Sequence, residues 1–347
     1  MEVSISGAGC RPTIAAALYG DAAAVAAMAA LDPRNDALVA EFAAYVNFSR
    51  ASLERLWNEN ISSFAVLPCD APPRRSREPT PTRLELRNAA PIVAADPCDL
   101  GAVRVPGAPV DVRELLAYAP FAFEGLVDES RDYEPMFAEL FDERGFAAPF
   151  GLTTAERRHP CFNYSWAHGD TWNQETWPYE TSRLLKGLAD RLHAGRGTAS
   201  LTAASYAALL TAYAEQHVNT TAVNDTGVPH VYENVHPFLG YWNNRERMYW
   251  TNNTEKDMGV HYFHSTFNDN VLAGLLGIRL DPRAVGRAEV RPLVDPARGP
   301  FAVDGVVLLD NRTLSATWDE AAGFAVYVDG VVRNRSDTVV PLWVDLE

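Results

Sequence analysis

Apolar residues recur every three to four positions over much of the first 280 residues, which is the spacing of one face of an α-helix. The segment 176–193 is the clearest of these, because Pro178 stands near its start and Gly195 just past its end. The first two segments are expected to pair as an αα-hairpin, since only a few residues separate them. We predict helices over 11–31, 36–57, 112–124, 133–144, 176–193, 201–218 and 265–276. Those over 112–124 and 133–144 are expected to be broken at Pro120 and Pro135.

The pattern changes after Gly277. Segments there alternate apolar and polar residues or run in β-branched residues, with turn signals such as Asp329-Gly330 between them. This pattern predicts a small antiparallel β unit of roughly 60 residues, near the lower size limit for an independent core and therefore expected to dock on the helices.

The domain organisation follows from these two patterns. We predict a mainly α protein with a helical domain over 1–280 and a C-terminal antiparallel β domain over 281–347. Residues 68–109 are rich in Pro and Arg and are predicted to form an exposed insertion in the helical domain.

The composition limits the classes of binding partner that the chain is expected to have. The formal net charge of -15 disfavours nucleic acid and anionic membrane surfaces, because like charges repel. No apolar run reaches the roughly 20 residues that cross a bilayer, so membrane insertion is not expected. A neutral small molecule suits this charge better than a polyanion. The sequence makes no prediction of oligomeric state.

Sequence signals for the compartment conflict. The start of the chain, MEVSISGAGC, lacks a basic region followed by an apolar run, so no signal peptide is visible. However, chance predicts roughly two N-x-[ST] glycosylation motifs, and the chain has several times that number, which favours a secretory route. The four cysteines stand far apart, which argues against a zinc site and leaves one or two disulfides open. The motifs begin at Asn47, Asn60, Asn163, Asn219, Asn224, Asn252, Asn311 and Asn334.

Two polar, aromatic stretches are the candidates for chemistry. One is the loop Tyr232-Glu233-Asn234, in which a carboxylate on a loop could serve as a general acid or base; the alternative is a solvated surface glutamate. The other is WNQETWPYETS, which begins at Trp172 and ends in a predicted helix. Aromatic faces beside amides and carboxylates suit sugars, although a buried aromatic cluster is the equal alternative.

Other chemistries find little support. The chain has no G-x-S-x-G motif for a serine hydrolase. Gly7 and Gly9 form a Gly-x-Gly pair without the third glycine of a phosphate loop. His261 and His264 have no third ligand nearby in the sequence, so no metal is predicted, and no cofactor is required.

Three motifs in order, WNQETWPYETS, YENVHPFLG and HYFHSTFNDNVLAGLLGIR, resemble the C-terminal half of six-hairpin, (α/α)6-barrel glycoside hydrolases. The resemblance is greatest to the mannosylglycerate-hydrolase-like, family 63-type group, and the trailing β segments are similar to the unit that follows the barrel in many members. It implies a partial (α/α)6 toroid followed by a small antiparallel β unit, because the barrel's earlier helices have no counterpart in this sequence.

The resemblance also implies an inverting reaction with two carboxyl groups, in which one protonates the leaving oxygen and the other activates water. Glu233 matches the general base of the family, and Glu2 is the candidate acid. The sugar site is then expected to be lined by Trp172, Trp177 and Tyr232, with Asn234 and Glu175 nearby.

Three functional hypotheses remain at this stage. The first is a glycoside hydrolase acting on a small carbohydrate. The second is a truncated, non-catalytic relative that binds sugar without turnover. The third is a purely structural helical protein with a β appendage.

Overall fold

The structure is a computed structural model, and it describes residues 5–6, 9–68, 109–162, 175–218, 231–243, 265–282, 284 and 286–347. The chain forms two compact units. The first consists of Met1–Ala148 and Leu152–Thr176, and the second of Pro149–Gly151 and Trp177–Glu347. The described part is helical with small antiparallel sheets, as the sequence predicts.

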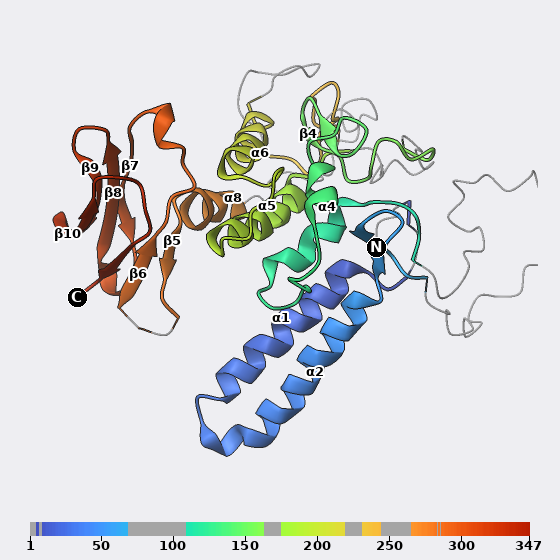
Figure 1. The fold of residues 1–347 in the computed structure, drawn as a ribbon, viewed down its shortest axis with the longest axis horizontal. Coiled ribbons are helices and arrows are strands. Elements are labelled where there is room, and N and C mark those ends of the chain that lie inside the picture. The colour runs from blue at the N-terminus through green and yellow to red at the C-terminus, as the bar shows by residue number, and fades with distance from the viewer. Residues whose placement is uncertain are drawn as a thin grey trace, which may run out of the picture. The chain divides into compact units, whose positions relative to one another are not determined.

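The first unit begins with the predicted αα-hairpin. Helices α1 (Pro12–Ala29) and α2 (Asp36–Glu54) run antiparallel, side by side (Figure 1). Pro12 opens α1, where its missing N–H costs no helical hydrogen bond. A single 3-10 turn, Pro33–Asn35, connects the helices and is capped by the Asp32 side chain, which accepts a hydrogen bond from the Arg34 amide. Both hairpin helices are therefore confirmed to within a few residues.

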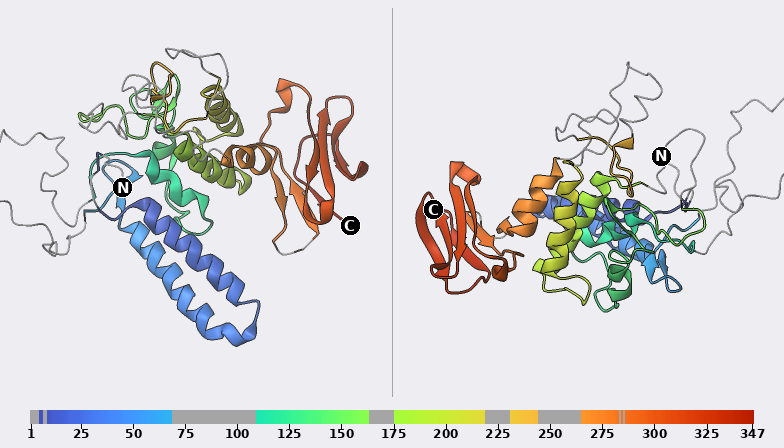
Figure 2. Two further views of the ribbon diagram at one scale, coloured as in Figure 1. Left: turned by 180° about the vertical axis from the view of Figure 1, so that it is seen from behind. Right: turned by 90° about the horizontal axis from the view of Figure 1, so that it is seen from above.

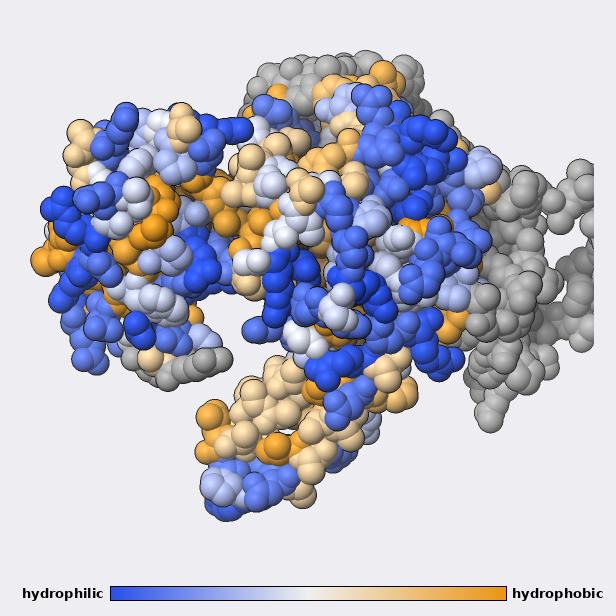
Figure 3. Space-filling model, in the orientation of Figure 1, coloured by the Kyte–Doolittle hydropathy of each residue, from blue (hydrophilic) through white to orange (hydrophobic). Residues whose placement is uncertain are grey.

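Much of the hairpin's apolar surface is uncovered (Figure 3). On α1, Leu18 is 52% exposed and Met28 is 62% exposed, and on α2 Phe48 is 66% exposed. By length and composition alone α1 could also cross a membrane, but core helices of soluble proteins pass the same test. The predicted helix α2 is thus present, but most of its apolar side chains are not buried.

The rest of the first unit packs around an aromatic cluster. Tyr133 is 2% exposed and meets Trp57, Phe64 and Phe121 with ring centroids 5.0–6.3 Å apart. These rings come from short elements: strands β1 (Trp57–Asn58) and β2 (Ser63–Phe64), and the 3-10 helix Leu115–Ala122. The cluster therefore supplies the core that such short strands lack.

Two predicted α-helices of this unit are wrong in type or length. The segment 112–124 contains a 3-10 helix, Leu115–Ala122, with Pro120 inside it, because proline cannot donate the hydrogen bond that an α-helix needs there. The segment 133–144 contains only α4 (Glu134–Ala138). Beyond α4 the chain turns so that the Phe146 and Gly145 amides bond to the Glu139 and Asp142 carbonyl oxygens. Strands β3 (Ala147–Ala148) and β4 (Gly151–Leu152) follow.

Cysteines and glycine secure the start of the first unit. Cys10 and Cys161 are each disulfide-bonded, which resolves a point the sequence left open. The backbone of Cys10 also forms an isolated antiparallel β-bridge with Leu67. A Cβ on Gly9 would stand 2.5 Å from the Leu67 carbonyl oxygen. Only glycine permits that approach. The predicted insertion 68–109 lies outside the described residues except at its ends.

Helices of the second unit pack around α5 (Pro178–His193), which confirms the clearest helix prediction. The helix α6 (Ala203–Glu215) begins with a capping box in which Thr202 and Ser205 exchange hydrogen bonds. Both pack against the segment that follows Ser265.

That last segment differs from the predicted α-helix over 265–276. It begins as α8 (Thr266–Asp269) and continues as a π-helix, Asn270–Leu275, in which the Leu276 amide bonds to the Val271 carbonyl at 2.9 Å. The Tyr206 hydroxyl donates to the Asn270 carbonyl at 2.8 Å, so a side chain of α6 competes for a carbonyl that an α-helix would use. The wider turn is thus a tertiary effect, invisible in the apolar pattern.

The C-terminal strands form two antiparallel sheets, orders β10-β9-β8-β7 and β11-β6-β5. Apolar side chains from both sheets share one buried core, which includes Val290, Leu314, Phe324 and Val344. The strands are drawn in orange and red in Figure 2. The strands are β5 (Ile278–Leu280), β6 (Arg287–Val290), β7 (Phe301–Val307), β8 (Thr313–Asp319), β9 (Gly323–Val328), β10 (Val331–Ser336) and β11 (Leu342–Asp345).

The predicted β turns are also confirmed. Asp329 and Gly330 both have positive φ, 49° and 76°, as a two-residue hairpin between β9 and β10 requires. The Asp329 side chain accepts hydrogen bonds from the Thr313 amide and hydroxyl, and this lowers the pKa of its carboxyl.

Candidate functional site

The loop that carries Glu233 is a narrow hairpin in the second unit. Val235 bridges Trp242, the His236 amide bonds to the Tyr241 carbonyl at 2.9 Å, and the Asn243 amide bonds to the Asn234 carbonyl at 3.1 Å. These backbone bonds fix the two arms on either side of a turn that Gly240 closes with a φ of 77°. Glu233 is half-buried rather than fully solvated.

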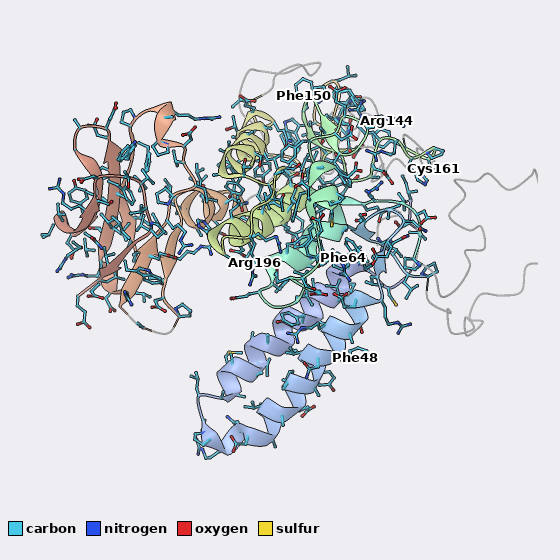
Figure 4. The ribbon with its side chains drawn as sticks, in the orientation of Figure 1. Phe48, Phe64, Arg144, Phe150, Cys161 and Arg196 are labelled. Carbon is cyan, nitrogen blue, oxygen red and sulfur yellow. The ribbon has the colours of Figure 1, made fainter. Side chains whose placement is uncertain are left out.

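A second support comes from the short segment Pro149–Gly151. The Phe150 amide donates to the Pro237 carbonyl at 3.0 Å (Phe150 is labelled in Figure 4). The turn of the Glu233 hairpin is therefore tied to a segment more than 80 residues earlier in the chain.

Aromatic rings join this hairpin to the helices behind it. Tyr232 packs on Trp242 at 5.8 Å between ring centroids, and Trp242 packs on His217 at 5.4 Å. His217 in turn lies 5.2 Å from Tyr213 of α6, whose ring lies 5.3 Å from Phe267 of α8. Burial lowers the pKa of the His217 imidazole, and the Tyr213 carbonyl near its Nδ1 opposes this only in part. The hairpin thus packs on a row of aromatic rings in which Trp242 and Tyr213 are fully buried.

Two buried amide side chains have atoms without a hydrogen-bond partner among the described residues. Asn234 is 4% exposed, and within the described residues its Oδ1 has no hydrogen-bond donor. Gln216, the C-cap of α6, is 1% exposed, and neither of its amide atoms has a partner in that same part of the chain. Leaving such an atom unsatisfied costs about 1–3 kcal/mol. The sequence pointed to Asn234 but not to Gln216.

The remaining predicted site residues lie on other segments of the chain. Trp177 is the N-cap of α5 and is 3% exposed, so its ring belongs to the core. Glu175 is buried in the first unit, where its backbone carbonyl accepts from the Thr154 amide at 3.0 Å. Glu2 and Trp172 lie outside the described residues. Tyr232, Glu233 and Asn234 share one described loop, in which they are neighbours in sequence.

The second unit also contains a cavity of about 450 Å³, in the size range of small-molecule sites. Its walls come from α5, α8, the π-helix and β5. No predicted site residue lines it. The lining residues are Ser182, Arg183, Lys186, Ala189, Asp190, Thr266, Asp269, Asn270, Ala273, Gly274 and Arg279.

The polar part of the cavity wall is tightly organised. Ser182 Oγ lies 2.5 Å from Thr266 Oγ1 and accepts from Asn270 Nδ2 at 2.8 Å. Asp190 pairs with both Lys186 and Arg279, at 2.6 and 2.7 Å. Residues 182, 183, 186 and 190 share one face of α5, so helical spacing in the sequence could have grouped them. Their hydrogen-bond and ion-pair partners include residues of distant segments, which spacing does not reveal.

The first described residues of the first unit are held by hydrogen bonds and an ion pair. The Ser6 amide donates to Glu114 Oε1 at 3.0 Å, and Arg11 Nη1 lies 3.6 Å from Glu114 Oε2. Arg11 and Glu114 are both buried, so removing one would leave a buried charge. His261 and His264 lie outside the described residues, and no group of three potential metal ligands occurs within those residues.

Comparison with known proteins identifies the family. The family model for the mannosylglycerate hydrolase MGH1-like glycoside hydrolase domain matches residues 2–265, which is most of the chain. The chain belongs to this glycoside hydrolase family. The resemblance noted in the sequence is therefore confirmed, and the match covers the Glu233 hairpin. No curated protein sequence matches the chain.

Solved structures similar to this MGH1-like chain are much longer than it. A protein described as a sialidase is 26% identical, with a TM-score of 0.76 over 99% of this chain and 28% of its own. A GH63 mannosylglycerate hydrolase from Thermus thermophilus is 16% identical, with a TM-score of 0.43 over 74% of this chain and 44% of its own. An uncharacterised conserved protein from Thermus thermophilus is 17% identical, with a TM-score of 0.40 over 70% and 48%. This MGH1-like chain thus spans less than half the length of each.

Proposed function

We propose that this protein is a glycoside hydrolase that cleaves an O-glycosidic bond of a small carbohydrate with inversion. Glu233 is the general base that activates water, and Glu2 is the general acid that protonates the leaving oxygen. The observation that carries the proposal is the Glu233 hairpin: a half-buried carboxylate beside Asn234, whose buried Oδ1 has no donor among the described residues. Family membership supplies the reaction class.

Substrate contacts follow from the same hairpin. Tyr232 offers an aromatic face to the apolar side of a sugar ring, and Asn234 accepts from a hydroxyl. Trp172, Trp177 and Glu175 complete the binding site in this proposal. Because Trp177 and Glu175 are buried, we assign them a role in shaping the sugar site rather than in presenting an open surface to the sugar.

The fold proposed for the helical domain is a partial (α/α)6 toroid over 1–280, followed by the β domain over 281–347. The helical hairpin α1–α2 and the packing of α5 against α6 are the observations that support it. In an inverting arrangement the two carboxyl groups stand about 6.5–9.5 Å apart, which leaves room for the attacking water.

The decisive experiment replaces Glu233 by Gln in the full chain and measures hydrolysis of a panel of p-nitrophenyl glycosides and disaccharides. Loss of the base is expected to lower kcat by about 10²–10⁴-fold, whereas Glu215→Gln, at an exposed position of α6, should change nothing. The anomer released first, followed by NMR, should be opposite to that of the substrate. A retained anomer, or full activity in Glu233→Gln, contradicts the mechanism.

A further inference from the structure

The N-x-[ST] motifs within the described residues differ in the accessibility of their asparagines. Asn47 on α2 is exposed, as are Asn60 and Asn311 in turns, whereas Asn334 on β10 is half-buried. The structure therefore separates motifs that the sequence cannot distinguish. The remaining motifs lie outside the described residues and begin at Asn163, Asn219, Asn224 and Asn252.

The disulfides are a second, independent observation. Cys10 and Cys161 are each disulfide-bonded, and no cysteine in the described part of the chain is free. Disulfides persist in oxidising compartments, among them the endoplasmic reticulum, and are rare in the cytosol. The endoplasmic reticulum also attaches glycans to asparagine in N-x-[ST] motifs. The state of the cysteines and the excess of motifs thus indicate the same route.

We propose that Asn47, Asn60 and Asn311 are acceptors of N-linked glycans and that Asn334 is unmodified in the folded protein. In this reaction the side-chain Nδ2 forms a bond to the anomeric carbon of an oligosaccharide carried on a polyisoprenyl diphosphate. The bond from that carbon to the diphosphate oxygen breaks, the lipid diphosphate leaves with the electron pair, and Nδ2 loses one proton. The proposal uses no residue of the Glu233 hairpin, so it is independent of the function proposed above.

Two of the acceptors stand in turns at the surface. Asn60 lies in the turn over 59–62 that joins β1 to β2, and Asn311 ends the 3-10 turn Leu309–Asn311 between β7 and β8. Asn311 has a φ of 57°, a left-handed conformation that asparagine adopts more readily than most residues with a side chain. Both side chains are exposed, so a glycan on either one projects into solvent.

Asn47 is helical, but its neighbours on α2 are small. Ala43 and Ala44 lie four and three residues before it and Ala51 four residues after it, and all three are exposed. Residues at these separations flank a side chain on a helix, so the alanines leave room for a glycan. A glycan at Asn47 keeps this side of α2 in contact with solvent.

The burial of Ser49 fixes when Asn47 is modified. Ser49 supplies the hydroxyl of this motif and is only 3% exposed, on a helix that packs mainly against α1. A transferase cannot reach that hydroxyl once the two helices have paired. Transfer to Asn47 therefore precedes the folding of the hairpin.

Asn334 is held by contacts that a glycan would disturb. Its Nδ2 donates to the Trp343 carbonyl at 2.9 Å, and its Oδ1 accepts from the Arg335 amide at 2.9 Å. A chain glycosylated at Asn334 has to place a sugar between β10 and β11 in order to fold. Such chains are therefore excluded from the folded protein, and Asn334 is an internal negative control with the same N-x-S motif as Asn47.

The test is site occupancy in the full chain, directed into the secretory route of a eukaryotic host by an added leader and purified from the medium. Peptide N-glycosidase in heavy-oxygen water converts each glycosylated asparagine into a labelled aspartate, which mass spectrometry locates. Asn47, Asn60 and Asn311 are expected to carry the label, and Asn334 to remain asparagine. A label at Asn334, or its absence from any of the other three, overturns the proposal.

A matched pair of variants at Ser49 separates the motif from the packing of the helix. Ser49→Ala removes the acceptor hydroxyl and should abolish the label at Asn47, whereas Ser49→Thr retains the hydroxyl and should preserve it. Both variants should keep the labels at Asn60 and Asn311, which shows that they pass through the same route. A label at Asn47 that persists in Ser49→Ala contradicts the assignment.

The order of transfer and folding has its own test. The chain made without glycans is incubated with a purified oligosaccharyltransferase and a lipid-linked oligosaccharide, either folded or after digestion with trypsin. Cleavage after Arg34 and Arg50 frees residues 35–50, which hold the Asn47 motif without tertiary structure. The digest should accept a glycan at Asn47 and the folded chain should not. Equal transfer to both shows that burial of Ser49 does not set the order.

Discussion

Helices α2 and α5 have similar lengths but opposite surroundings. Of the 19 residues of α2, only Ser49 and Leu53 are buried, although its sequence includes Leu38, Phe42, Tyr45 and Phe48. In contrast, α5 buries 11 of its 16 residues, including the charged Glu180 and Arg191. Apolar composition therefore does not decide burial in this protein. The neighbours of a helix do, because α5 packs on α6, α8 and the π-helix, whereas α2 packs mainly on α1.

The difference also has an electrostatic side. Burial raises the pKa of the Glu180 carboxyl and lowers that of the His193 imidazole, both on α5. Helix α2 buries no ionisable side chain. The buried ionisable side chains of α5 thus require hydrogen-bond and charge partners, whereas α2 has no buried ionisable side chain that requires them.

The largest expected loss of stability comes from shortening a buried leucine of α5, with an exposed leucine of α2 as the comparison. Leu185→Ala on α5, where the side chain is fully buried, is expected to lower the free energy of unfolding by about 2–5 kcal/mol through loss of burial and a cavity. Leu38→Ala on α2, 39% exposed, should change it by no more than about 0.5 kcal/mol. Urea unfolding at low protein concentration, followed by tryptophan fluorescence, measures both. Equal losses would remove the contrast between the helices.

A smaller effect is expected at the contact between the π-helix and its neighbours. A Cβ on Gly274 would stand 2.1 Å from the Tyr206 hydroxyl and 3.5 Å from the Ala189 Cβ of α5. Gly274→Ala should therefore destabilise the second unit by about 1–3 kcal/mol through overpacking.

The double variant Gly274→Ala with Tyr206→Phe sharpens this result. Removing the hydroxyl relieves the clash, so the two changes together should cost less than their sum, by an interaction energy of about 0.5–3 kcal/mol. Additive costs would mean that the close approach to Tyr206 is not what Gly274 permits.

The smallest effect is the pH dependence from His193. Its Nε2 lies 2.8 Å from the Gly274 carbonyl, and burial, followed by the charge of Arg279, lowers its pKa below the ordinary 6.5. The unfolded chain then binds more protons than the folded one below about pH 6.5, so stability is lost as the pH falls through that value toward the lower folded pKa.

Urea midpoints of the parent and of His193→Gln, compared between about pH 8 and about pH 5, isolate this contribution. The variant should show the shallower fall on acidification. Glu180 acts with the opposite sign, because its raised pKa makes its contribution fade as the pH rises, but it is common to both proteins. Identical pH profiles would exclude His193 as the sensing group.

The sequence by itself determined the local elements of this protein. Apolar spacing with Pro178 and Gly195 marked α5, and Asp329-Gly330 marked a hairpin, because these residues act on the backbone of their own segment. The ordered motifs also pointed to the correct glycoside hydrolase family.

Only the tertiary structure decided which faces are covered and which side chains meet. The π-helix depends on a hydroxyl of Tyr206, 64 residues earlier than Asn270, and the cavity wall unites Ser182 with Thr266. Likewise, α2 is amphipathic in sequence but largely uncovered in space. Such contacts arise from segments distant along the chain, and periodicity within one segment contains no information about its neighbours.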